Sequence, residues 1–204
     1  MKAYCKLLFP AMGLCMLLSG CGKAAEPAND ALEKPASAPT IISSQTIAEQ
    51  SVPSVAQAKE LIGALNTIDK LAASAVSVEK EKPHQSDNGA VYYRYTGKEF
   101  VAVQDVRALL NKSMTADFVA ERYASLLEGD QPICLDVEGA LYVQYRPKGG
   151  GFAFTETEPL IEKTSEDGYS ILAEYDDYGK LTTLEIRLVL QDGQYLISGV
   201  TFGE

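Results

Sequence analysis

Histidine and tryptophan are nearly absent from this chain of 204 residues, which has one histidine and no tryptophan. Without a second histidine or a Cys-x-x-Cys pair, it lacks the ligand sets that zinc sites use most often. It also has no Asp-x-Asp-x-Asp-Gly calcium loop, no Gly-x-Ser-x-Gly elbow and no phosphate-binding glycine-rich loop that opens a helix. We therefore expect no metal ion, no cofactor and no enzymatic activity.

Cysteine is scarce in the body of the chain, where Cys134 is the only one beyond residue 21. A lone cysteine cannot form an internal disulfide. Its apolar neighbours predict a strand in which the thiol is a small buried group. The alternative is a nucleophile activated by His84, but nothing in the polar stretch around His84 indicates such a pair.

Long apolar runs are also missing. The longest, residues 7–18, is about a dozen residues long, whereas a transmembrane helix needs roughly 20. Lysines precede this run, and small residues follow it directly before Cys21. The pattern resembles a bacterial lipoprotein signal peptide over residues 1–20, which implies that Cys21 becomes the first residue and carries a lipid. The alternative is an ordinary secretion signal beside an unrelated cysteine.

A lipidated Cys21 would place the protein on the outer, extracytoplasmic face of a cell membrane. Each buried methylene group of a lipid contributes about 0.8 kcal/mol, and stable anchoring takes more than one acyl chain. We therefore expect contact with the membrane through the lipid anchor alone.

Basic residues are outnumbered, with 18 lysines and arginines against 28 acids and a formal net charge of −10. This balance argues against binding to nucleic acid and against charge-driven binding to anionic polymers or lipids. It suits a basic protein partner or a cationic ligand. The alternative is that the carboxylates only keep a secreted protein soluble.

The chain divides into a tether and a domain. Residues 21–53 are rich in Ala, Ser, Pro, Thr and Gln and offer little to pack, so we expect a disordered tether behind the lipid. Residues 54–204 have the length of one ordinary domain. Ser54 and Gln57 form a capping box at the start of an amphipathic helix over residues 54–76.

After this helix we expect short elements and then hairpins. A loop, two strands joined at Gly97-Lys98 and two helices come first, at residues 80–88, 90–96, 100–103, 104–111 and 115–128. After Pro132 apolar residues alternate, and turns are expected at Glu138-Gly139, Asp167-Gly168 and Asp192-Gly193. Helices first and an antiparallel meander last predict an α+β fold, with N-terminal helices packed on a curved antiparallel sheet.

Tyrosine and arginine gather in two short stretches. Adjacent side chains of a strand point to opposite faces, so a run of them cannot all face a core. Both residue types are enriched at binding hot spots. The alternative is that they are amphipathic residues at the edge of the core. The candidates for partner binding are Tyr92, Tyr93, Arg94, Tyr95, Tyr145 and Arg146.

Short motifs between residues 91 and 202 are similar to those of the IseA-like proteins, a family of inhibitors of cell-wall DL-endopeptidases. The family usually has Trp at the position of Tyr195. The motifs are Tyr93-Arg94-Tyr95, Met114-Thr115 at the start of a helix, Gly139-Ala140-Leu141-Tyr142-Val143, Gly149-Gly150-Gly151 and the closing Asp192-Gly193-Gln194-Tyr195-Leu196-Ile197.

The resemblance implies a non-enzymatic protein that covers the active-site cleft of an NlpC-type cysteine endopeptidase acting on peptidoglycan. An acidic domain fits a partner with a basic cleft, because charge complementarity raises the rate of encounter. The resemblance also directs attention to the segment at Gly149-Gly150-Gly151, so the adjacent Lys148 is a further candidate partner-binding residue.

The closing meander is also similar to the NTF2-like domains, which are cone-shaped α+β domains found on bacterial lipoproteins. This alternative implies a pocket between a helix and a curved sheet, lined by tyrosines. Such a pocket would bind a small molecule or an envelope partner.

Overall fold

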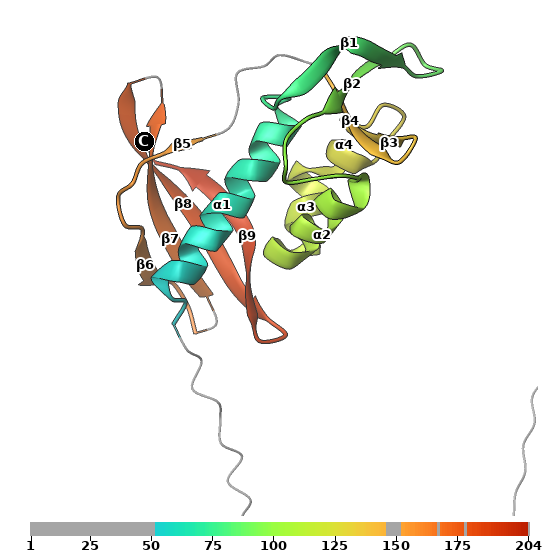
Figure 1. Cartoon of the computed structure of the whole chain (residues 1–204). Helices are drawn as coiled ribbons and strands as arrows, with labels where there is room; N and C mark the ends of the chain where they lie inside the picture. The colour runs from blue at the N-terminus through green and yellow to red at the C-terminus, as the bar shows by residue number, and fades with distance from the viewer. Residues whose placement is uncertain (1–51, 146–151, 167, 178, 204) are drawn as a thin grey trace, which may run out of the picture. The chain divides into compact units, whose positions relative to one another are not determined.

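The computed structural model describes residues 52–145, 152–166, 168–177 and 179–203 (Figure 1). These residues form helices and antiparallel strands, so the α+β class is confirmed. The expected signal peptide, Cys21 and nearly all of the expected tether lie outside the described residues.

The first helix, α1 (Val55–Ala72), begins at the predicted capping box. The Ser54 hydroxyl accepts the Gln57 N–H (3.2 Å), and the Gln57 side chain accepts the Ser54 N–H (2.8 Å). The helix is shorter than expected, because Ser74 has a left-handed backbone with φ of 56°. Its hydroxyl also donates to the carbonyl of Gln144 (2.6 Å), which fixes the end of α1 against a distant strand.

The loop expected at residues 80–88 is wrong for residues 80–85, because β1 (Val78–Gln85) pairs there with β2 (Val91–Tyr95), and only residues 86–88 lie in the turn between them. The register shifts between Glu79 and His84. Most of β1 is polar and exposed, so it has no apolar alternation that would predict a strand. Cross-strand pairing with β2 supplies what the local sequence lacks.

The strand expected at residues 100–103 is also wrong. Phe100 is buried, and the chain turns there into α2 (Val103–Ser113). The Asp105 carboxylate accepts the N–H groups of Val101 (2.7 Å) and Ala102 (3.0 Å), which satisfies the free donors at the helix start.

The helix expected at residues 115–128 is divided into α3 (Ala116–Arg122) and α4 (Ala124–Leu127). Thr115 caps α3 as predicted, because its hydroxyl accepts the Phe118 N–H (3.3 Å). The break falls at Tyr123, whose backbone leaves helical geometry. The Tyr123 hydroxyl donates to Asp69 of α1 (2.8 Å), so a tertiary contact accompanies the break.

A four-stranded antiparallel sheet has the order β1-β2-β4-β3. Its hairpin joins β3 (Cys134–Val137) to β4 (Ala140–Gln144) through the predicted turn at Glu138-Gly139. Both turn residues have positive φ, 51° and 80°, as a two-residue hairpin of this type requires.

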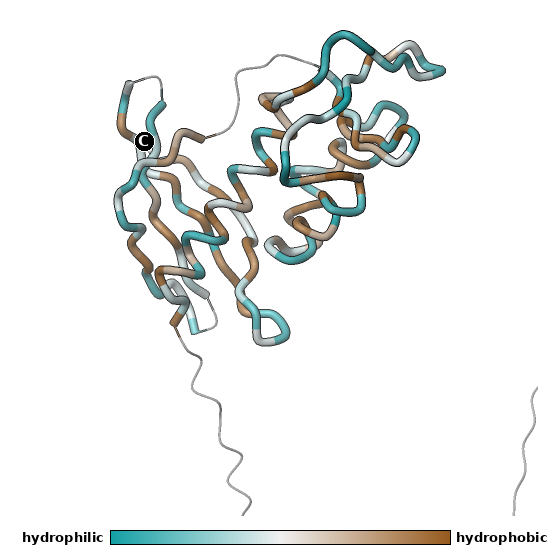
Figure 2. The backbone as a smooth tube through the Cα atoms, in the orientation of Figure 1, coloured by the Kyte–Doolittle hydropathy of each residue, from teal (hydrophilic) through white to brown (hydrophobic). Residues whose placement is uncertain are grey.

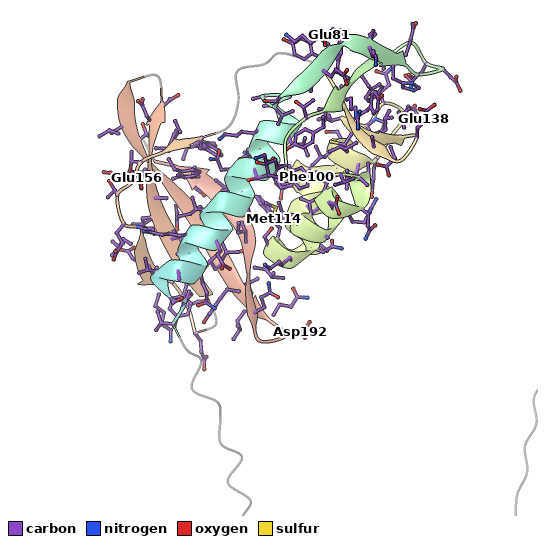
Figure 3. All side chains as sticks on the ribbon, in the orientation of Figure 1. Glu81, Phe100, Met114, Glu138, Glu156 and Asp192 are labelled. Carbon is purple, nitrogen blue, oxygen red and sulfur yellow. The ribbon has the colours of Figure 1, made fainter. Side chains whose placement is uncertain are left out.

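A second antiparallel sheet has the order β5-β7-β8-β9, with β6 also paired to β7. Its β8–β9 hairpin turns at Asp192-Gly193, as predicted, and Figure 3 labels Asp192 at its tip. The expected single meander is therefore two sheets, since turn residues fix local hairpins but not which hairpins join. The strands are β5 (Ala153–Phe154), β6 (Leu160–Lys163), β7 (Gly168–Asp177), β8 (Lys180–Gln191) and β9 (Gln194–Phe202).

Buried side chains from α1, α2, β4 and β7 to β9 belong to one apolar cluster. Figure 2 shows hydrophobic segments along the strands of the second sheet and hydrophilic residues at the β8–β9 turn. Where α2 ends, Met114 bridges to Ile197 and the Thr115 N–H donates to the Ile197 carbonyl (2.9 Å). These backbone contacts place the end of α2 beside β9.

Candidate functional site: a groove between two helices

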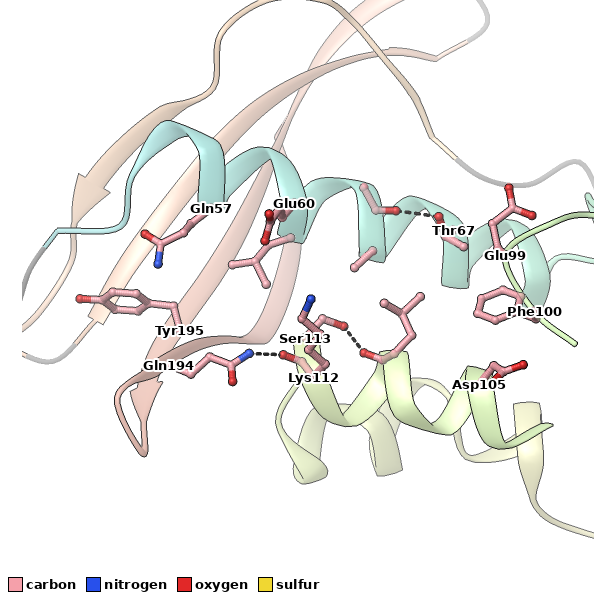
Figure 4. A pocket seen from close by; sticks show the side chains of 14 residues that line it. Gln57, Glu60, Thr67, Glu99, Phe100, Asp105, Lys112, Ser113, Gln194 and Tyr195 are labelled. Atoms are coloured by element: carbon pink, nitrogen blue, oxygen red, sulfur yellow. Dashed lines mark hydrogen bonds between the residues drawn. The ribbon is translucent and has the colours of Figure 1, made fainter. Parts of the chain in front are cut away.

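A groove of about 470 Å³ lies between α1 and α2 (Figure 4). We call it the α1–α2 groove. Its volume falls within the range of small-ligand sites, roughly 300–1,000 Å³. Its walls are Gln57, Glu60, Leu61, Gly63, Ala64 and Thr67 on α1 and Asp105, Leu109, Lys112 and Ser113 on α2, with Glu99, Phe100, Gln194 and Tyr195 at its ends.

Each wall of the groove is one stripe of a helix, because most of its residues recur at intervals of three or four. The α1 stripe contains small residues at its middle. A Cβ atom added at Gly63 would meet no atom within 4 Å, and Ala64 beside it is only half-buried. Small side chains on α1 therefore leave open space opposite α2.

One end of the groove is held by β9. The Gln194 side-chain amide donates to the carbonyl of Lys112, as Figure 4 shows. The Ser113 hydroxyl donates to the carbonyl of Leu109 (2.6 Å). The Gln194 bond holds the last turn of α2 beside the start of β9, where the Tyr195 ring closes the groove.

The other end of the groove is acidic. The Glu99 carboxylate accepts hydrogen bonds from the Tyr95 hydroxyl and from the Lys98 N–H (2.9 Å), and these bonds lower the pKa of Glu99. The backbone N–H groups that Asp105 accepts lower the pKa of that carboxyl too. Both groups therefore hold a negative charge beside the Phe100 ring at neutral pH.

Two further charged side chains line the groove without an ion-pair partner. Among the described residues, the recorded ion pair joins Arg122 to Asp69 (3.3 Å). Neither the Glu60 carboxylate nor the Lys112 ammonium is therefore neutralised by a described residue. The groove presents Glu60, Glu99 and Asp105 against Lys112, an excess of negative charge.

The tyrosines predicted as binding residues on β2 do not line this groove. Tyr92 is 1 % exposed, and its hydroxyl donates to the Pro132 carbonyl (2.8 Å). Tyr95 is bound to Glu99 and lies 5.9 Å from the Phe100 ring, centroid to centroid. Both are therefore structural contacts of the sheet and of the segment that leads into α2.

Tyr93 and Tyr145 do come together. Their rings meet edge to face with centroids 5.5 Å apart. The Lys80 ammonium lies 4.7 Å from the centre of the Tyr145 ring and donates to the Tyr145 hydroxyl (3.3 Å). We call Lys80, Tyr93 and Tyr145 the tyrosine patch. Lys80 was missed because its segment was taken for a loop.

The remaining predicted candidates lie elsewhere. Arg94 is exposed, but it neighbours Tyr93 on β2 and so points to the opposite face of the sheet. Arg146, Lys148 and the lipid-attachment candidate Cys21 lie outside the described residues. The groove residues were missed because Glu60 and Lys112 match the ordinary solvent-facing side of an amphipathic helix.

A buried polar cluster joins α1 to α3. Asp69 is 8 % exposed, accepts the Tyr123 hydroxyl and pairs with Arg122, while its Oδ2 atom is buried without a hydrogen bond. Burial is the largest influence and raises the pKa of Asp69, although Arg122 and Tyr123 oppose it. The cluster links two helices and does not line the groove.

Cys134 is buried, and burial raises the pKa of its thiol to about 12. It pairs with Val143 across the β3–β4 hairpin, whereas the His84 ring lies 5.9 Å from Tyr142 on the neighbouring position of β4. Because adjacent strand residues face opposite sides, Cys134 and His84 lie on opposite faces of the sheet. The two residues do not form a nucleophile–base pair.

The described ranges contain no group of three His, Cys, Asp or Glu side chains that could hold a metal ion. No helix within those ranges is long and apolar enough to span a bilayer. In comparisons with known proteins, no family model matches the chain and no curated protein matches it.

Proposed function

We propose that this protein is a non-enzymatic regulator of peptidoglycan DL-endopeptidases, held on the outer face of the cell membrane by a lipid on Cys21. The single observation that supports docking to a protein is the tyrosine patch. Tyr145 is 37 % exposed, Tyr93 is half-buried and Lys80 is exposed. Tyrosine is one of the residues enriched at binding hot spots, and two tyrosine rings lie together here with part of their surface open to solvent.

The charge of the chain supports the choice of partner. A formal net charge of −10 favours encounter with a basic surface and disfavours contact with other acidic molecules. An NlpC-type cysteine endopeptidase with a basic active-site cleft has this complementarity. The motifs shared with the IseA-like proteins point to the same partner.

The test mixes the chain lacking residues 1–21 with a DL-endopeptidase of the same cell and follows the clearing of purified peptidoglycan. This deletion removes no described residue. We expect dose-dependent slowing that weakens with added salt, because exposed charges are screened. The double variant Tyr93→Ala/Tyr145→Ala loses potency by at least about tenfold, as for a hot spot.

The matched control is Tyr142→Ala, which removes a half-buried tyrosine from the opposite face of the same sheet. The inhibitory potency of this variant is expected to stay within about twofold of wild type, because Tyr142 is not part of the tyrosine patch. Unchanged clearing with the wild-type chain overturns the inhibitor proposal. Equal loss in both variants overturns the role of the tyrosine patch.

A second candidate function, binding of a small molecule, is supported by the volume of the α1–α2 groove. The NTF2-like resemblance implies a pocket lined by several tyrosines between a helix and a curved sheet. The groove instead lies between two helices, with Tyr195 as its tyrosine. The finer fold, with α1 to α4 as a layer on the curved β7–β9 sheet, is also our proposal, supported by the shared buried cluster.

A further inference from the structure

The α1–α2 groove has features of a peptide site that the inhibitor proposal does not use. Leu61, Ala64, Leu109 and Phe100 form its apolar lining. Three carboxylates also line the groove, Glu60 on α1 and Glu99 and Asp105 near Phe100. From this arrangement we infer that the groove binds a short extended peptide segment that carries cationic side chains and apolar ones.

The length of the groove sets the size of this segment. The α1 wall runs from Gln57 to Thr67, which at 1.5 Å per residue is about 15 Å. An extended chain advances about 3.3 Å per residue. The groove therefore accommodates roughly five residues of extended peptide, with side chains directed alternately into the lining and toward the rim.

The charges set the chemistry of the segment. Glu99 and Asp105 mark one end, and their hydrogen bonds keep them ionised. Glu60 stands on the α1 wall without an ion-pair partner among the described residues. Lys112 is the single cation of the lining, so a basic segment gains more favourable contacts than an acidic one.

Two features make binding at this groove energetically accessible. The walls are helices held by backbone bonds and by the Gln194 contact, so little needs to be ordered when the ligand enters. The open space at Gly63 has no atom to be displaced. The inference does not rest on the inhibitor proposal, because the tyrosine patch and the groove share no residue.

The test uses the chain lacking residues 1–21 and a fluorescein-labelled peptide of roughly five residues that alternates lysine and leucine. Fluorescence anisotropy gives its Kd. A matched peptide that alternates glutamate and leucine, with the same label, reports binding without the correct charge. We expect the lysine peptide to bind at least about tenfold more tightly, with an affinity that falls as salt rises.

Gly63→Leu fills the groove, and leucine is a better helix former than glycine, so the variant retains its fold. We expect this variant to raise the Kd of the lysine peptide by at least about tenfold. Its control is Ala108→Leu, which adds the same side chain at an exposed position of α2 that does not line the groove. Glu60→Gln is expected to weaken binding about threefold and Glu121→Gln, an exposed residue of α3, to leave it unchanged.

The inference is overturned if the lysine peptide does not bind at up to about 1 mM. It is also overturned if binding survives Gly63→Leu, or if the glutamate peptide binds equally well. Peptidoglycan clearing separates this inference from the inhibitor proposal. If groove variants no longer bind the peptide but still slow peptidoglycan clearing, the groove is a peptide site that is separate from the inhibitory surface.

Discussion

At the scale of single residues, Asp69 is the group whose ionisation should change stability with pH. Its raised pKa means that the folded chain holds this proton more tightly than the unfolded chain, in which the pKa is about 3.9. The free energy of unfolding therefore falls as pH rises from about 4 through the raised folded pKa. Asp69→Asn keeps an acceptor for Tyr123 and removes the titration.

We expect the stability of Asp69→Asn relative to wild type to improve as pH rises from about 4 through the raised pKa of Asp69, by about 1.4 kcal/mol for each unit by which the pKa is raised. Urea unfolding at a series of pH values measures this difference. Asp130→Asn, at an exposed aspartate, is the control and should show no such trend. A pH-independent difference for Asp69→Asn would contradict the linkage.

The sequence shows that tyrosines gather on β2, but it does not show which residue each tyrosine contacts. Tyr92 and Tyr93 are neighbours of the same type, yet one donates to the Pro132 carbonyl and the other meets Tyr145. Both partners lie about 40 residues or more further along the chain. Period-two alternation separates the two faces of β2, but only the arrangement of distant segments decides which face is covered.

At the scale of elements, the capping box of α1 gives a direct stability prediction. Ser54→Ala removes the acceptor for the Gln57 N–H and is expected to lower the free energy of unfolding by about 1 kcal/mol. Urea unfolding monitored by circular dichroism measures the change. Ser125→Ala, in the exposed turn of α4, should stay within about 0.5 kcal/mol of wild type. Equal effects of both substitutions would show that the cap contributes nothing.

The start of α1 was predictable and its end was not. The Ser74 N–H donates to the Leu71 carbonyl (3.0 Å) and the Ala75 N–H to the Lys70 carbonyl (2.8 Å), the bonding of a Schellman motif. Glycine usually occupies the left-handed position of this motif, whereas here it is Ser74. The sequence therefore lacks the usual stop signal, and the bond from Ser74 to β4 takes its place.

The groove could not be predicted for a related reason. Helical periodicity identifies the polar side of α1 and of α2 correctly, and a polar side normally faces solvent. No local pattern states that the polar side of one helix faces another helix across a gap. That arrangement depends on β9, whose Gln194 and Ile197 hold the end of α2.

At the scale of the whole molecule, the division into two sheets follows from pairings that turn residues do not encode. The hairpins at Glu138-Gly139 and Asp192-Gly193 form where the sequence places them. β4 then pairs with β2, which precedes α2 in the chain, and not with β5. Such non-local pairing carries the entropy of closing a long loop and is selected by burial, not by local propensity.

The proposed position of the molecule in the cell depends on Cys21. Two or more acyl chains hold a protein stably on a bilayer, whereas the described residues contain no helix able to span it. We expect the wild-type chain to fractionate with membranes, to resist a salt wash and to take up labelled palmitate. Cys21→Ser should lose the label and the resistance to washing, because no lipid can be attached.

The matched control is Cys134→Ser, which removes the other cysteine beyond the signal segment. Because this thiol is 2 % exposed, with a pKa of about 12, it is unreactive in the folded chain and should not accept a lipid. Cys134→Ser is therefore expected to remain in the membrane fraction and keep the palmitate label. If Cys21→Ser keeps the palmitate label, the lipid is attached to another residue. If the wild-type chain takes up no label, the protein is secreted without a lipid anchor.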